Sequence, residues 1–146
     1  MTNPKPTVAI TFGAILAMVL SISVAVFAGA PEKPADYDPT DGWDIPPPVE
    51  NIENPVDDDE DARSQGERLY ERECASCHGD SGQGDGPDAS DLDDFPGDFT
   101  SDAFADLPDG VIFFMTKEGK DDMPSFDGDL TDQQIWQVIR YIRTLE

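Results

Sequence analysis

Cys74-Ala75-Ser76-Cys77-His78 is the stretch of this sequence that decides its fold. It has the spacing C-x-x-C-H, which is typical of a covalently attached c-type haem. Two thiols three positions apart can each add to a vinyl group of one porphyrin, and the histidine that follows can ligate the iron from one face. We therefore expect one covalent haem c per chain, bound through Cys74 and Cys77, with His78 as an iron ligand.

Three other interpretations of this motif explain less of the sequence. A tetrahedral zinc site needs about four nitrogen or sulfur ligands, whereas Cys74, Cys77 and His78 are the only cysteines and histidine of the chain. A redox-active C-x-x-C would be expected near a βαβ pattern, and none is visible. A structural disulfide would use both thiols but leave His78 without a role, and it stays the alternative.

The second axial ligand has to be a methionine if it comes from this chain, because His78 is its single histidine. Met115 lies in the apolar run 111–115, where packing in the core is the simpler explanation. Met123 lies in a polar, turn-like stretch, and Pro124 biases it toward an extended backbone. We therefore predict Met123 as the second iron ligand. A thioether opposite an imidazole favours ferrous iron, and two filled axial positions leave no open site for a substrate.

The chain is strongly acidic, with a formal net charge of -23 at pH 7. Nucleic-acid binding is excluded as a function, because contact with phosphates needs a basic patch. Two explanations of the acidity stay open. It can steer a basic partner at low salt, or it can keep the protein hydrated in a saline environment, where screening would remove the steering.

Residues 1–30 form an apolar segment at the N-terminus. The stretch from Val8 to Phe27 carries no charged residue and has the length of about 20 residues that a membrane-spanning helix needs. Ala28-Gly29-Ala30 is similar to a signal cleavage site, but we expect Pro31 to hinder the cut. We therefore predict an uncleaved transmembrane anchor, with a removed signal as the alternative. Lys5 before the span orients the rest of the chain outward.

This orientation predicts a single-pass protein of the bacterial cytoplasmic (inner) membrane, with the haem domain on the periplasmic side. Residues 31–61 are predicted to be an extended, acidic, Pro-rich linker, because prolines interrupt helices and the like charges of 57–61 repel one another. Trp43 and Ile45 are unusual in such a segment. They are either incidental apolar residues or a contact with a partner subunit.

Residues 62–146 are predicted to be the folded domain. The pattern indicates a first helix from about Ala62 to Cys74, with Ser64 and Glu67 as a capping box. Gly66 inside this helix is best explained by close approach of another helix. Thr131 and Gln134 form a second capping box, followed by an apolar stripe from Ile135 to Leu145.

Two further segments of the domain are less regular. The apolar run from Pro108 to Glu118 is predicted to be a short helix, with a buried strand over 111–115 as the alternative. Residues 79–97 are rich in Gly and Asp and predict a loop. Read from Asp80, this loop fails the EF-hand pattern, since Gly82 and Gly84 occupy ligand positions. A small core of this kind gains from a bound cofactor.

These residues together resemble a class I monohaem cytochrome c of the small bacterial kind. The resemblance covers residues 62–146 and implies an all-α fold in which the first and last helices cross, with Gly66 and Tyr70 meeting Trp136 and Tyr141. It also implies that Pro87 offers its carbonyl to the Nδ1–H of His78. The departure from the family is the acidity of the loops around the haem edge, which carry Asp80, Asp85, Asp121, Asp122 and Asp127. The resemblance rests on C-x-x-C-H, Gly66, Tyr70, Gly84-Asp85-Gly86-Pro87, Pro96-Gly97-Asp98-Phe99-Thr100, Met123-Pro124 and residues 135–143.

The expected function is that of a membrane-anchored c-type cytochrome, not itself an enzyme, which carries single electrons on the non-cytoplasmic face of the membrane. Its expected partners are membrane redox complexes and other electron carriers. The alternative is a fixed cytochrome c subunit of a larger respiratory or photosynthetic oxidoreductase. A haem-based gas sensor or small enzyme is the third possibility, and it would need Met123 to be absent or labile.

Overall fold

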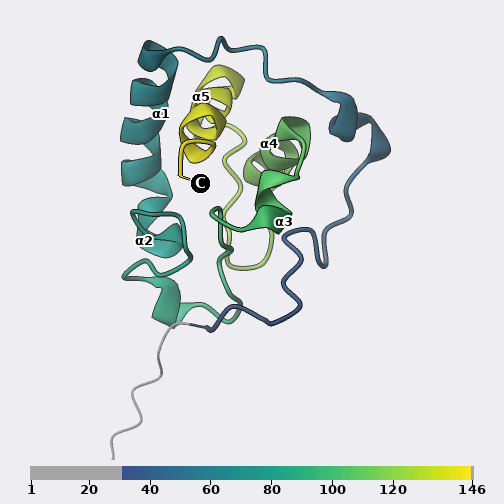
Figure 1. Cartoon of the computed structure of the whole chain (residues 1–146), viewed down its shortest axis with the longest axis vertical. Helices are drawn as coiled ribbons and strands as arrows, with labels where there is room; N and C mark the ends of the chain where they lie inside the picture. Colours follow the sequence, from purple (N-terminus) through teal and green to yellow (C-terminus); the bar gives the residue numbers. More distant parts are fainter. Residues whose placement is uncertain (1–30, 146) are drawn as a thin grey trace, which may run out of the picture.

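Helices α1 (Glu60–Glu73) and α5 (Asp132–Ile142) lie side by side and form the frame of the domain (Figure 1). The computed structural model describes residues 31–145. Helix α4 (Asp109–Glu118) packs on α5, and the described residues contain isolated β-bridges but no strand. The fold expected from the sequence, all-α, is therefore confirmed for this part of the chain. The remaining helices are short: α2 (Ala75–His78), α3 (Asp102–Ala105) and the 3-10 helices Pro47–Asn51 and Ala89–Asp91.

The contact between α1 and α5 depends on a glycine. A Cβ atom at Gly66 would lie 2.0 Å from the carbonyl oxygen of Gln137 and 3.0 Å from the Cβ of Tyr141. Tyr70, one turn further along α1, is fully buried, and its ring centroid lies 5.2 Å from that of Tyr141. The close helix approach predicted from Gly66 is therefore confirmed, and so is the meeting of the first and last helices.

The substitution Gly66→Ala is expected to lower the free energy of unfolding by about 2 kcal/mol, although alanine is the better helix former by about 1 kcal/mol. The added methyl group would overlap the backbone of Gln137, which cannot rotate away, so the two helices would have to separate. Denaturant titration of the haem-loaded protein measures the change. Glu67→Ala, at the next and exposed position, is the control and should stay within about 0.5 kcal/mol of the parent. Unchanged stability of Gly66→Ala would contradict the packing described above.

Helix α1 begins earlier than the sequence pattern indicates. Asp59 is its N-cap, and the Asp59 carboxylate accepts a hydrogen bond of 2.8 Å from the Ala62 N–H. Ser64 lies inside the helix, where its hydroxyl oxygen accepts from Arg68. The capping box predicted at Ser64 is wrong, because Asp59 is an equally good cap that comes first. Acidic side chains in the first turn then interact favourably with the helix dipole.

The later helices follow their signals more closely. At the start of α5 the Thr131 hydroxyl accepts from the Gln134 N–H at 3.3 Å, and the Gln134 side chain accepts from the Thr131 N–H at 2.8 Å, so this predicted capping box is confirmed. Helix α4 has Pro108 as N-cap and Gly119 as C-cap. The strand alternative for 111–115 is wrong, since no strand in residues 31–145 could pair with it. Helix α3 was not predicted; it begins at the Ser101 cap.

Residues 31–56, here called the N-terminal strap, lie against the domain and do not extend away from it. The strap passes around the outside of α4 before the chain enters α1 (Figure 1). The 3-10 helix Pro47–Asn51 packs so closely on α4 that a Cβ at Gly110 would lie 2.0 Å from the Val49 carbonyl oxygen. Near the end of the strap, the Val56 carbonyl accepts a 2.6 Å hydrogen bond from Arg140. The expected free extension of this segment is not observed.

The strap packs on the domain through its backbone carbonyl groups, which the sequence pattern does not reveal. Prolines interrupt α-helix in the strap, where the structure has only the short 3-10 helix Pro47–Asn51. They leave the carbonyl groups of the strap free to accept hydrogen bonds from the domain. Arg140 uses this possibility at Asn54 and Val56. The Asn54 side chain in turn donates to the carbonyl of Trp136 at 3.1 Å. The end of the strap and α5 therefore each donate hydrogen bonds to the other.

No helix within residues 31–145 combines the length and the apolar character that crossing a membrane requires. The anchor predicted over residues 1–30 lies outside the described residues. The choice between an uncleaved anchor and a removed signal therefore stays a prediction.

Candidate cofactor site

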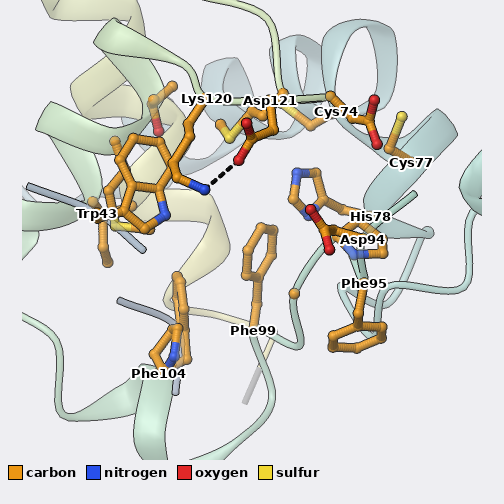
Figure 2. A pocket seen from close by; sticks show the side chains of 18 of the residues that line it. Trp43, Cys74, Cys77, His78, Asp94, Phe95, Phe99, Phe104, Lys120 and Asp121 are labelled. Carbon is orange, nitrogen blue, oxygen red and sulfur yellow. Dashed lines mark hydrogen bonds and ion pairs between the residues drawn. The ribbon is translucent and has the colours of Figure 1, made fainter. Parts of the chain in front are cut away.

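A cavity of about 390 Å³ lies between the helices, the strap and the loop that follows α2. Cys74, Cys77 and His78 lie on one side of it, Trp43 and Lys120 lie on the opposite side, and the ring of Phe99 stands between them (Figure 2). The cavity therefore brings together residues that are far apart in the sequence. Of the predicted site residues, Cys74, Cys77, His78 and Met123 line it, and Pro87 does not.

The two cysteines and the histidine are held by a short helix and the loop behind it. Cys74 ends α1, and α2 follows at once as a single turn that carries Cys77 and His78. The N–H groups of Gly84, Gly86 and Asp88 donate to the carbonyls of His78, Cys77 and Ser76 at 2.8, 3.2 and 2.8 Å. Carbonyl groups at the end of a helix have no partner within the helix. By donating to them, the loop fixes the orientation of α2 and of the side chains that it carries.

The loop can approach α2 this closely only because it contains glycine. A Cβ at Gly86 would lie 2.2 Å from the Ser76 carbonyl oxygen. The Gly-rich stretch after the motif thus has a packing role. In residues 31–145 no group of three or more His, Cys, Asp or Glu side chains is arranged to hold a metal ion.

Two side chains support His78 in ways that sequence reasoning missed. The buried hydroxyl of Tyr70 donates a 2.6 Å hydrogen bond to the carbonyl of Gly79, the residue after His78. The ring of Phe99 stacks on His78 with centroids 4.5 Å apart and an angle of 27°. The resemblance placed Tyr70 at the contact between the first and last helices, but no local signal indicated the partner of its hydroxyl. Phe99 belongs to a stretch on which the resemblance rests, and nothing in that stretch indicated a stack on His78.

Burial controls the protonation of the motif. It lowers the pKa of His78 to about 4, so the imidazole is neutral at neutral pH and its nitrogen lone pair is available to a metal. Burial, followed by the nearby Glu73 and Cys77, raises the pKa of the Cys74 thiol to about 12. This is opposite to the lowered pKa of reactive thiolates in dithiol oxidoreductases. Both thiols are free.

His78 also carries the one buried side-chain polar atom of residues 31–145 that has no hydrogen-bond partner, its Nδ1. The contact with the Pro87 carbonyl, which the resemblance implied, is not made. Pro87 is exposed, and the loop around it turns its N–H groups toward the end of α2. A role for Pro87 stays a prediction. Buried polar atoms without partners are rare. The nitrogen that His78 would offer to an iron is the other one, Nε2, so a bound haem would not supply the partner that Nδ1 lacks.

Both candidate methionines line the cavity. Met115 projects from α4, and Met123 lies on a tight turn after it. In this turn the N–H of Lys120 donates to the Met123 carbonyl and the N–H of Met123 donates to the Lys120 carbonyl, both at 2.9 Å. The Ser125 hydroxyl fastens the following residues by donating to the Lys117 carbonyl at 2.8 Å. The end of the turn is therefore anchored to α4, which helps to place Met123 at the cavity.

These residues fit a covalent haem. Two free thiols, a neutral imidazole and a thioether face one cavity whose lining also contains Phe95, Phe99, Phe104 and Ile112. Cys74 and Cys77 would hold the porphyrin, and His78 and Met123 would ligate its iron. The bound haem would supply a one-electron couple, while the chain contributes attachment, ligands and exclusion of water.

The rim of the cavity is acidic. Of the loop acids expected around it, Asp121 and Asp122 line the cavity, whereas Asp80, Asp85 and Asp127 do not. Further carboxylates come from places that the sequence did not suggest: Asp38 and Asp41 of the strap, Glu73 and Asp94. Lys120 is the one basic residue among the lining residues, and it forms an ion pair with Asp121 (Figure 2).

Comparison with known proteins identifies the family of the chain. Residues 61–142, more than half of the chain, match the family described as cytochrome c oxidase, cbb3-type, subunit III. The matched segment includes both cysteines, His78 and both candidate methionines. None of the curated proteins compared with this sequence matches it.

Two solved structures are similar to the chain. A chain of the reducing HAO-like protein complex of Kuenenia stuttgartiensis is 30% identical with a TM-score of 0.58, and the match covers 64% of this chain and 49% of that one. The present chain thus spans about half the length of that relative. A chain described as KustC0563 c-type cytochrome is 23% identical with a TM-score of 0.49, covering 56% of this chain and 96% of that one. The first likeness supports the helical fold.

Proposed function

Because this chain belongs to the family described as cytochrome c oxidase, cbb3-type, subunit III, we propose that it is a monohaem carrier that passes single electrons between redox partners. Domains of this family bind one haem c covalently, and a cytochrome c domain implies electron transfer. The observation that carries the proposal is the meeting of Cys74, Cys77, His78 and Met123 at one cavity. With both axial positions filled from the chain, the iron would be reserved for electron exchange.

A redox titration followed by absorption tests this proposal against the sensor or enzyme alternative. The haem-loaded protein is expected to follow a one-electron Nernst curve, and the ferrous protein is expected not to bind carbon monoxide. Rapid binding of carbon monoxide by the unaltered protein would indicate an open iron position, and the carrier proposal would then have to be abandoned.

We place the domain at the periplasmic face of the bacterial inner membrane, held there by residues 1–30. The uncharged stretch from Val8 and the position of Pro31 support an uncleaved anchor. Burial of an apolar helix in a bilayer is not screened by salt, so the protein should stay with the membranes after a high-salt wash. A soluble chain that begins at Pro31, identified by intact mass, would contradict the anchor and would favour a diffusible carrier.

The second candidate function is that of a fixed subunit within a larger oxidoreductase. Two observations favour it: the family description names an oxidase subunit, and the strap packs on its own domain. A free, extended segment of this length could carry the domain several tens of ångströms from the membrane, at about 3.1 Å per residue. A strap that packs on the domain shortens this distance, because it holds the domain close to the end of the proposed anchor. Purification from detergent-solubilised membranes separates the two, since a fixed subunit should travel with other haem proteins.

A further inference from the structure

The strap crosses the cavity from one loop to another. Near its start, the Tyr37 hydroxyl accepts a 3.2 Å hydrogen bond from the Asp98 N–H, and its ring meets Phe95 edge-to-face with centroids 5.5 Å apart. Lys33 adds an ion pair of 2.7 Å with Asp98. Asp98 is nearly buried, and although burial opposes its charge, hydrogen bonds from Lys33 and Thr100 give it a lowered pKa.

On the opposite side of the cavity, the strap contacts the turn that carries Met123. The ammonium of Lys120 lies 5.9 Å from the centroid of the Trp43 ring, a cation–π arrangement (Figure 2). The backbone is also close, because a Cβ at Gly42 would lie 3.2 Å from the Lys120 ammonium nitrogen. Trp43 is half-buried and lines the cavity itself.

Ser125 anchors the end of the Met123 turn, but the tip of the turn, residues 120–123, has few contacts with other segments of the chain. It holds Asp121 at a φ of 51°, in the left-handed region that side chains other than glycine rarely adopt. Besides the two hydrogen bonds between Lys120 and Met123, the Asp122 carboxylate accepts a 2.8 Å hydrogen bond from the Asp93 N–H. Opening of the turn would move Lys120 away from Trp43. The contact between these two side chains therefore favours the closed turn.

We propose that Trp43 is a positioning residue for the haem ligand Met123: through Lys120 it keeps the Met123 turn closed, and its ring excludes water from the haem. This inference rests on the proposed haem function. It gives the N-terminal strap a part in setting the redox properties of the domain, in place of the linker role expected from the sequence. Loss of the ring would let the turn open more often, so that water or an added ligand could replace the thioether.

The test uses the full-length, haem-loaded protein and its Trp43→Ala variant. Imidazole is titrated into the ferric protein, and the midpoint potential is measured separately. Trp43→Ala is expected to bind imidazole about tenfold more tightly, which corresponds to about 1.4 kcal/mol, and to have a lower potential. Trp43→Phe should restore most of both properties, because it keeps an aromatic ring under the ammonium. Ile45→Ala is the matched control, since Ile45 belongs to the strap but does not line the cavity.

Lys120→Ala provides a second variant of the same contact. It should reproduce the imidazole effect, and the Trp43→Ala/Lys120→Ala double variant should show less than the sum of the single effects. Unchanged imidazole affinity and potential in Trp43→Ala, equal changes in Ile45→Ala, or additive single effects would each overturn the positioning role. Parent protein that carries no covalent haem would instead contradict the proposed function itself, so the two failures are distinguishable.

Discussion

The Met123→Ala protein is expected to have a markedly lower redox potential than the parent. Axial ligands set the potentials of haem proteins over a range of about 0.8 V. The thioether favours ferrous iron, and without it the ferrous haem would also be open to carbon monoxide. A redox titration and a carbon monoxide difference spectrum measure the two effects. The size of the change follows from the loss of a metal ligand, which no neighbouring side chain of the turn can replace.

Met115→Ala is the matched control, because Met115 faces the same cavity from α4. Met115 is half-buried, so its truncation should cost at most the lower end of the about 2–5 kcal/mol found for buried methionines, and the potential should stay near that of the parent. The charge-transfer band of the thioether–iron bond should be present in Met115→Ala and absent in Met123→Ala. The reverse pattern would mean that the ligand is Met115.

The Cys74→Ala/Cys77→Ala double variant is expected to carry no covalent haem and to lose cooperative folding. Without the haem, the apolar side chains around the cavity of about 390 Å³ would lose the group on which they pack. Whole domains have stabilities of only about 5–15 kcal/mol. The variant should therefore collapse or unfold rather than keep the native packing. Circular dichroism and limited proteolysis measure this.

Ser76→Ala is the control for the cysteine variant. Ser76 lies between the two cysteines and is exposed, so its removal should change neither haem content nor the midpoint of unfolding. A double cysteine variant that unfolds with the cooperativity and midpoint of the parent would contradict the view that the haem forms the centre of the core.

The part of the site that could be predicted from the sequence is the part encoded locally. Cys74, Cys77 and His78 are neighbours on one turn, so their spacing alone places them at one point. Met123 was identified because an apolar residue in a polar turn lacks a packing explanation, and the structure brings it to the same cavity. The contact of α1 with α5 was also predictable, because Gly66 interrupts a helix at a cost that only close packing explains.

The strap could not be predicted because its contacts are non-local and use the backbone. Arg140 binds the carbonyl of Val56, 84 positions away, and no periodicity records such a contact. Two signals were present and insufficient by themselves. Gly110 inside an apolar helix marks a close approach, here of Val49. Trp43 is an aromatic residue in a polar segment, and the structure places it on its own domain beside Lys120.

Acid–acetone extraction of the purified protein, followed by the intact mass of the denatured chain, tests the central claim most directly. Thioether bonds through Cys74 and Cys77 survive denaturation, so the haem should remain on the polypeptide and the chain should weigh one haem more than its sequence. Haem that extracts freely, with both cysteines recovered as unmodified thiols or as a disulfide, would contradict the account.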